Sequence, residues 1–227
     1  AIHGLHMARA FHKKFGDRFL FFVNTVKDNT LAGIPHQLLF GPFGRRIKLW
    51  GLRGALIAFP VRTFFRSNVS WQGGETVVFI NDPALISLGV LLKRTFSVSF
   101  VFESHGSLAR HHAQLLSEYA DRIIFTTPYL AEEFRAQYPQ KAEILKAIGN
   151  AVDVAAFTHV TKTKDELRTT LNLTPGFLVG YVGRFEPLGE DKGLSLLLRS
   201  LSQLPPDTRL LFVGGSAGEI ARYQSLA

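Results

Sequence analysis

The chain has 227 residues, enough for one large domain or two modest ones, and hydrophobic residues make up 46% of it against 19% charged residues. That balance excludes an intrinsically disordered chain, and the lack of cysteine excludes disulfides, thiolate metal sites and a cysteine nucleophile. The 26 lysine and arginine residues against 18 acidic residues give a net charge of +8, which predicts a polyanionic partner: nucleic acid, an anionic membrane face or a phosphorylated small molecule. No apolar run reaches the ~18–20 residues that cross a bilayer, so we expect a soluble or peripheral protein.

In the first 150 residues, stretches with helical spacing alternate with short apolar runs that are typical of strands. A helix over residues 1–15 ends at Gly16 and leads into a strand over residues 19–23. A loop rich in glycine and proline follows at residues 33–44, and then a basic helix that we expect to end at Pro60. The later predicted elements are strands at 77–80, 98–102, 122–126 and 143–148 and helices at 84–93, 108–119 and 129–137. This alternation indicates a mostly parallel sheet, and because the chain opens inside a helix, we expect the sheet to lack its initial strand.

The last third begins a second pattern of strand, helix and strand. Thr163 and Glu166 have the spacing of a capping box, which predicts a helix up to Leu171. The elements predicted after it are a strand at 177–182, a helix at 194–204 and a strand at 209–213. These form one βαβ unit, and the residues after 157 are fewer than the ~150 of an α/β nucleotide-binding domain, so we expect the second domain to be truncated.

Four segments carry a resemblance to a known family, because they occur in order and at nearly the expected spacing. They are Gly149-Asn150-Ala151-Val152-Asp153 with Phe157, residues 178–185 (LVGYVGRF), Lys192-Gly193-Leu194, and residues 210–215 (LLFVGG). The chain resembles the family 4 retaining glycosyltransferases, which have the two-domain GT-B fold. The resemblance implies two Rossmann-like α/β domains: residues 1–150 on the acceptor side, an interdomain crossing at 151–157, and the start of the nucleotide-sugar-binding domain at 158–227.

Gly183, Arg184 and Lys192 are the predicted donor diphosphate-binding residues, and the two cations are also predicted to be catalytic. A strand that ends in Gly183-Arg184 places an arginine at the carboxyl edge of a parallel sheet, where open α/β folds bind ligands. Lys192 precedes a predicted helix whose unpaired N–H groups favour an anion, and two converging cations suit a diphosphate. Ordinary surface cations are the alternative. The loop from Arg184 to Lys192 is also a few residues longer than is usual in the family.

His105 is the third predicted catalytic residue. It lies in Glu103-Ser104-His105-Gly106, which ends a predicted strand and is similar to the family's strand-end loop with a histidine. The resemblance implies that His105 and Glu103 lie on the acceptor side, with His105 near the transferred sugar or the acceptor. A solvated loop histidine is the alternative for His105, and a surface acid is the alternative for Glu103. No metal-binding motif is present, so we predict no metal site.

The densest basic stretch covers residues 45–66 and supports a different class of function. Its residues Leu49, Leu52, Leu56 and Phe59 share one helical face flanked by cations, as in interfacial helices. An ordinary, largely buried helix is the other interpretation. The alternative to an enzyme is therefore a basic α/β module that binds an anionic membrane or nucleic acid, although the sequence has no nucleic-acid motif.

For the complete protein, the resemblance implies transfer of a sugar from a nucleoside diphosphate sugar to a saccharide or lipid acceptor, with retention of configuration. We expect no cofactor and no nucleic-acid partner. We expect a cytoplasmic location, with the anionic inner face of the membrane as a further partner. The family's later E-x7-E motif, which contacts the donor, would lie beyond residue 227. We therefore expect the 227 residues alone to be an inactive fragment.

Overall fold

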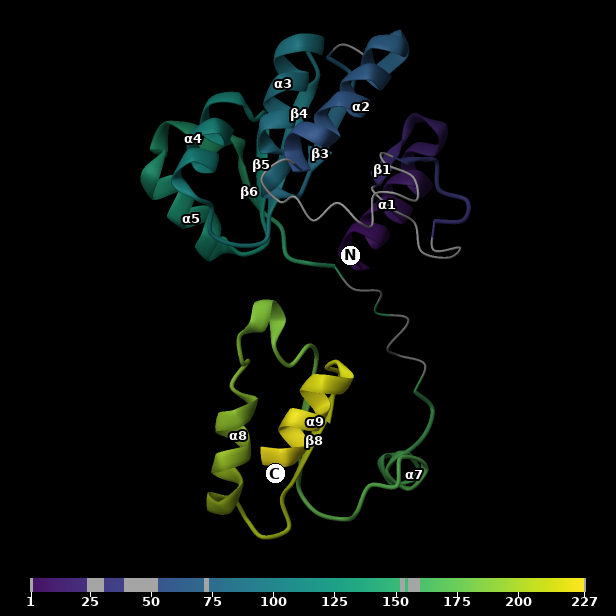
Figure 1. The fold of residues 1–227 in the computed structure, drawn as a ribbon, viewed down its shortest axis with the longest axis vertical. Helices are drawn as coiled ribbons and strands as arrows, with labels where there is room; N and C mark the ends of the chain where they lie inside the picture. The colour runs from purple at the N-terminus through teal and green to yellow at the C-terminus, as the bar shows by residue number, and fades with distance from the viewer. Residues whose placement is uncertain are drawn as a thin grey trace. The chain divides into compact units, whose positions relative to one another are not determined.

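The computed structural model describes residues 2–23, 31–38, 53–71, 74–151, 154 and 160–226. The chain divides into two compact units, Ala1–Val152 and Asp153–Ala227 (Figure 1). The predicted crossing at residues 151–157 lies largely outside the described residues, so the predicted domain limits stay predictions. Within the described residues, no helix is long and apolar enough to span a membrane.

The first unit is built around a four-stranded parallel sheet. Its strands, in the order in which they pair, are β3 (Val77–Ile80), β4 (Ser99–Ser104), β5 (Arg122–Phe125) and β6 (Leu145–Ala147). The helices that connect them are α3 (Ile86–Phe96), α4 (Arg110–Tyr119) and α5 (Pro128–Gln137). The prediction of a parallel sheet is confirmed, and the register pairs Ile80 with Phe102 and Ser104 with Phe125. All four strands therefore end at the same edge.

Phenylalanine side chains dominate the core between this sheet and its helices. Phe100 and Phe102 are fully buried in β4, and Phe125 is 2% exposed in β5. Gly89 lets α3 approach β4 closely, because a Cβ at this position would lie 2.4 Å from the ring of Phe100. Beyond the core, Lys93 of α3 donates to the Asp121 carboxylate at 2.5 Å, and that carboxylate also accepts the N–H of Phe100 at 2.7 Å.

Two predictions for the N-terminal part of this unit are wrong. Helix α1 (Ile2–Phe15) and strand β1 (Phe21–Val23) form as expected, but β1 pairs in parallel with a strand β2 (His36–Leu38), which lies within the predicted loop. Three residues are too few to show an alternating pattern. Helix α2 (Arg53–Ser67) continues through Pro60, whose missing N–H costs one helical hydrogen bond. Burial of the stripe Ile57, Val61 and Phe65 offsets that loss.

The second unit contains a pair of parallel strands, β7 (Leu178–Val182) and β8 (Arg209–Val213), in the predicted βαβ arrangement. Its helices are α7 (Lys164–Thr170), α8 (Leu194–Ser200) and α9 (Ala217–Leu226). The capping box of α7 is confirmed by hydrogen bonds between Thr163 and Glu166 in both directions. Helix α9 was not predicted. It supplies Tyr223 to a small core with Phe185 and Leu194, each at most 3% exposed.

Short 3₁₀ turns complete the described elements. They lie at Gly16–Arg18, Val69–Trp71, Pro83–Leu85, Pro139–Ile144, Pro187–Gly189 and Leu201–Gln203. The first four lie next to longer elements, Pro187–Gly189 lies in the middle of the loop between β7 and α8, and the last extends α8 by one turn. The predicted helix at 194–204 is therefore an α-helix that ends in a tighter turn, as helix termini commonly do.

Candidate functional site

Two glycine turns lie side by side where β7 and β8 end. Gly183 has φ +153° and Gly214 has φ +127°, both in the range that favours glycine. The N–H of Gly183 donates to the carbonyl of Val213 at 2.9 Å, which joins the two turns. A Cβ on Gly214 would lie 2.0 Å from the carbonyl oxygen of Gly183. Only glycine fits at position 214. Because Gly183 and Gly214 have no side chains, the edge where β7 and β8 end is formed largely by backbone atoms.

Arg184 leaves this edge toward solvent while its neighbour anchors the turn. Phe185 is 2% exposed and packs against Leu194 and Tyr223, whereas Arg184 is exposed. The hydroxyl of Tyr181 donates to the carbonyl oxygen of Arg184 at 2.6 Å. The backbone of Arg184 is therefore fixed on one side by a hydrogen bond and on the other by a buried ring, and its guanidinium faces water.

The long loop between the two predicted cations folds back on itself. Its middle residues form the turn Pro187–Gly189, and the N–H of Lys192 donates to the carbonyl of Phe185 at 3.3 Å. The extra residues are taken up by this turn, so the backbone of Lys192 lies next to the residue that follows Arg184. The structure thus brings the backbones of both cations to the same edge, and Lys192 is also exposed.

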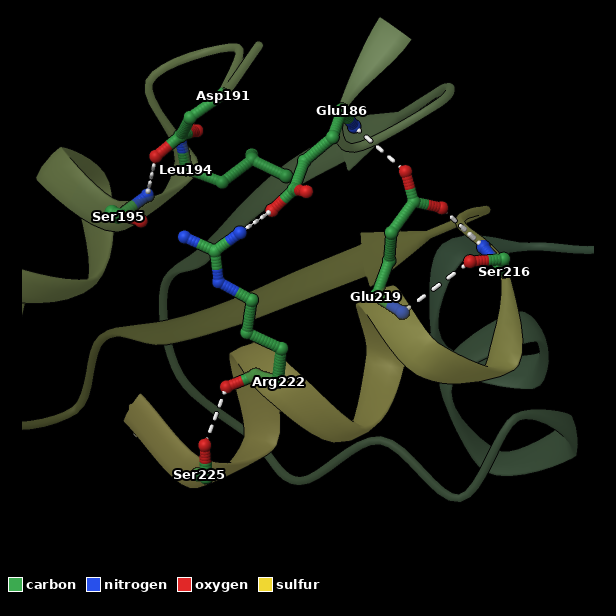
Figure 2. A network of polar contacts seen from close by, with 8 residues as sticks. All are labelled: Glu186, Asp191, Leu194, Ser195, Ser216, Glu219, Arg222 and Ser225. Carbon is green, nitrogen blue, oxygen red and sulfur yellow. Dashed lines mark hydrogen bonds and ion pairs between the residues drawn. The ribbon is translucent and has the colours of Figure 1, made fainter. Parts of the chain in front are cut away.

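The N-terminus of α8 is not an open anion site, although the sequence predicts unpaired N–H groups there, next to Lys192. The carboxylate of Asp191 accepts the N–H of Leu194 at 2.8 Å and the N–H of Ser195 at 3.2 Å (Figure 2). Hydrogen bonding from the Ser195 side chain and from the helix backbone lowers the pKa of Asp191 to about 2. The chain's own carboxylate therefore occupies the position that a phosphate would need.

We expect Asp191→Ala to lower the stability of the second unit at pH 7, with a difference from the wild type that shrinks in acid. The pKa of Asp191 is depressed to about 2 in the folded state, so its carboxylate stabilises the fold above the unfolded pKa of about 3.9. This contribution is lost as the pH falls through about 2. Urea midpoints followed by NMR signals of α8 at neutral and acid pH measure it. Glu190→Ala, an exposed change in the same loop, is the control, and a pH-independent Asp191→Ala difference would contradict the assignment.

Glu103 and His105 form a second candidate group, in the first unit. Glu103 lies at the end of β4 and is 5% exposed, so the alternative that it is a surface acid is wrong. Its Oε2 atom lies 3.4 Å from Nε2 of His105, whose side chain is 36% exposed. The hydroxyl of Ser104 donates to the carbonyl of Gly106 at 2.8 Å and tightens the turn between them. A buried carboxylate thus orients a half-exposed imidazole at the carboxyl edge of the sheet, as catalytic histidines require.

Sequence reasoning missed a group of polar residues on α9 that contact the loop after β7. Glu219 accepts the N–H of Glu186 at 3.0 Å, and Arg222 donates to the Glu186 carboxylate at 2.6 Å (Figure 2). Glu219 also accepts the N–H of Ser216, and the Ser216 hydroxyl accepts the N–H of Glu219. Ser216 and Glu219 therefore form a capping box. That S-x-x-E spacing is a signal in the sequence that predicts α9.

Two further predictions concern metals and membranes. Among the residues that the structure describes, no group of three or more histidine or carboxylate side chains is placed to hold a metal ion. Residues 45–52 of the basic stretch lie outside the described residues. In the part of α2 whose side chains are described, Ile57, Val61 and Phe65 are buried, so this part packs as an ordinary domain helix. Phe59, the one residue of the predicted stripe whose burial is described, is 77% exposed. Membrane binding stays a prediction.

No family model and no curated protein matches the chain. Among solved structures, the chain is similar to HepE of Anabaena in complex with UDP, with a TM-score of 0.72 and 20% identity over 100% of this chain and 61% of HepE. The complex of HepE with UDP-glucose gives a TM-score of 0.70 and 19% identity over 98% and 62% of the two chains. The chain is also similar to a glycosyltransferase from Rickettsia africae, with a TM-score of 0.66 and 14% identity. That match covers 98% of this chain and 60% of the Rickettsia protein.

The chain shares the fold of these proteins. The predicted α/β fold of the GT-B kind is thereby confirmed, at identities of 14–20% that establish the fold alone. The chain spans about three fifths of the length of these structures: 61% of HepE and 60% of the Rickettsia protein.

Proposed function

We propose that this chain is part of a glycosyltransferase and that its second unit binds the diphosphate of a nucleoside diphosphate sugar. The observation that carries this proposal is the edge where Gly183 and Gly214 meet, from which Arg184 projects into solvent. Ligands of open α/β folds bind at this end of the strands. The fold likeness to HepE, solved with UDP and with UDP-glucose, supports the same ligand class.

The chemistry follows from the charge that the leaving group acquires. When the bond between the sugar and the diphosphate breaks, negative charge grows on the phosphate oxygens. Fixed cations that are already in place stabilise this charge more in the transition state than in the ground state. Arg184 suits the task because its guanidinium can donate two parallel hydrogen bonds to phosphate oxygens, and Lys192 adds a point charge.

The finer features rest on the resemblance to family 4 glycosyltransferases. In this proposal the acceptor attacks from the face that the diphosphate leaves, so configuration is retained without a protein nucleophile. His105, oriented by Glu103, acts near the transferred sugar or the acceptor, and the acceptor is a saccharide or a lipid. The nucleotide sugar is a substrate, and the mechanism uses no separate cofactor.

Calorimetric titration of the chain with UDP, ADP, GDP, inorganic pyrophosphate and uridine tests the donor site. A diphosphate site predicts that at least one nucleoside diphosphate binds with defined stoichiometry, more tightly than pyrophosphate, and that uridine does not bind. The alternative of a basic module without a donor site predicts that pyrophosphate and the nucleoside diphosphates bind alike, with weak, strongly salt-dependent affinity. That second outcome, or no binding of any nucleoside diphosphate, would overturn the proposed function.

A further inference from the structure

One carboxylate on α9 joins the two loops that follow β7 and β8. Oε1 of Glu219 accepts the N–H of Glu186 at 3.0 Å, and Oε2 accepts the N–H of Ser216 at 2.5 Å (Figure 2). Glu186 belongs to the loop after β7 and Ser216 to the loop after β8. Because the two parallel strands end at the same edge, Glu219 bridges both loops directly beside the candidate donor site.

The segment that carries Arg184 is held at three points. The hydroxyl of Tyr181 binds the carbonyl of Arg184 at 2.6 Å, and the ring of Phe185 is buried in the core. Glu219 holds the N–H of Glu186 on the other side. The first point belongs to β7, and the second is shared, because the ring of Phe185 packs against Leu194 of α8 and Tyr223 of α9. The third comes from α9, so the direction in which the turn leaves β7 depends on a helix more than thirty residues further along the chain.

Charge links Glu219 to Arg184 as well. Hydrogen bonds from the backbone and the hydroxyl of Ser216 lower the pKa of Glu219, with further contributions from the N–H of Glu186 and from the positive charge of Arg184. The carboxylate is therefore ionised at neutral pH. Arg222, on the same helix, is instead paired with the Glu186 carboxylate at 2.6 Å. The negative charge of Glu219 thus interacts with the positive charge of Arg184.

We propose that Glu219 is a positioning residue for Arg184: it fixes the turn from which the arginine projects and so holds the guanidinium in the orientation that a bound diphosphate needs. This inference rests on the proposed function. The alternative is that Glu219 only caps α9. The two roles predict opposite changes in diphosphate affinity when the charge of Glu219 is removed, because an anion near a diphosphate repels it. If Glu219 only caps the helix, removing its charge strengthens diphosphate binding, whereas loss of a positioning contact weakens it.

The test is the affinity for UDP of the wild type, Glu219→Gln and Glu190→Gln, measured by calorimetry on the whole chain. Glu190 is a matched control: it is exposed in the loop after β7 that Glu219 contacts, and its side chain makes no hydrogen bond or ion pair among the residues that the structure describes. We expect Glu219→Gln to weaken binding by about fivefold or more, as for residues coupled through one hydrogen-bond network, and Glu190→Gln to leave it unchanged or slightly tighter. Equal or tighter binding by Glu219→Gln would overturn the inference.

Two further arms separate this inference from the proposed function. In an Arg184→Gln background, Glu219→Gln should cause no additional loss, because the group that it positions is gone; a full additional loss would assign Glu219 another role. Without ligand, Glu219→Gln should speed the hydrogen exchange of the Glu186 amide, since a charge-assisted acceptor becomes a neutral one, and Glu190→Gln should not. If the wild type binds no nucleoside diphosphate, the proposed function fails, and the exchange rate still decides whether Glu219 holds the turn: an unchanged rate overturns the inference.

Discussion

Arg184→Ala is expected to lower the rate of sugar transfer by roughly 10²–10³-fold in a protein that contains this chain and catalyses transfer, because it removes a fixed donor to developing charge. The loss should fall mainly on kcat, with a smaller increase in the donor KM, since the charge on the diphosphate grows as the bond to the sugar breaks. Arg184→Lys should recover part of the rate, because a point charge cannot reproduce the planar guanidinium. Steady-state kinetics with varied donor concentration measure all three quantities.

The control for this experiment is Arg199→Ala. Arg199 is an exposed arginine in the last turn of α8, so its loss changes the net charge of the same unit equally. We expect it to leave kcat within about twofold, because an exposed charge at the C-terminal end of α8 is screened by solvent and salt. The loss of kcat in Lys192→Ala should lie between the losses in Arg184→Ala and Arg199→Ala. If Arg184→Ala keeps a normal kcat while the protein remains folded, Arg184 does not stabilise the leaving group.

Gly214→Ala is expected to destabilise the second unit by about 2–5 kcal/mol, the sum of an overpacked contact and a strained backbone. The added Cβ would lie 2.0 Å from the carbonyl oxygen of Gly183, and φ at this position is +127°. Relief requires the two turns to separate, which would also break the hydrogen bond from Gly183 to Val213. Guanidinium unfolding followed by NMR signals of β7 and β8 gives the free energy of unfolding of this unit.

Gly218→Ala provides the matched comparison for that substitution. Gly218 lies in α9, four residues further along, and a Cβ there meets no atom within 4 Å. Alanine is preferred over glycine in helices by up to about 1 kcal/mol, so this variant should be neutral or more stable. If Gly214→Ala proves as harmless as Gly218→Ala, the two turns do not pack as the structure has them, and the shape of the candidate site is wrong.

The strands that form the sheets could be predicted well from the sequence. The predicted bounds 77–80 and 209–213 agree with β3 and β8 at both ends, because each contains a continuous apolar run, Val77–Ile80 and 210–213, between polar or glycine residues. The helix at α7 followed from a local capping box. Strand β2 could not be found this way, since its three residues form a strand only by pairing with β1. Helix α2 passes Pro60 because tertiary packing outweighs a local breaker.

The sequence predicts where the residues of the candidate site lie relative to the strands, but it does not predict the contacts that they make. Gly183 and Arg184 were placed at a strand end by the pattern of the sequence alone. The partner of Gly183 across the edge, Gly214, depends on how two loops meet. The occupation of the α8 N-terminus by Asp191 and the bridge through Glu219 likewise depend on side chains that meet only in the folded chain. Such contacts leave no periodic signal, although the spacing of Ser216 and Glu219 marks one of them.

The most direct test of a diphosphate site at the β7–β8 edge is an NMR titration of the chain with UDP that maps where the nucleotide binds. A site at this edge predicts saturable shifts of the backbone amides of Gly183, Arg184 and Gly214 and of the Nε–H signal of Arg184, with α7 unaffected. It also predicts that Arg184→Gln removes or strongly weakens these shifts. Shifts confined to α7 or to the first unit, or shifts at the β7–β8 edge that persist unchanged in Arg184→Gln, would contradict it.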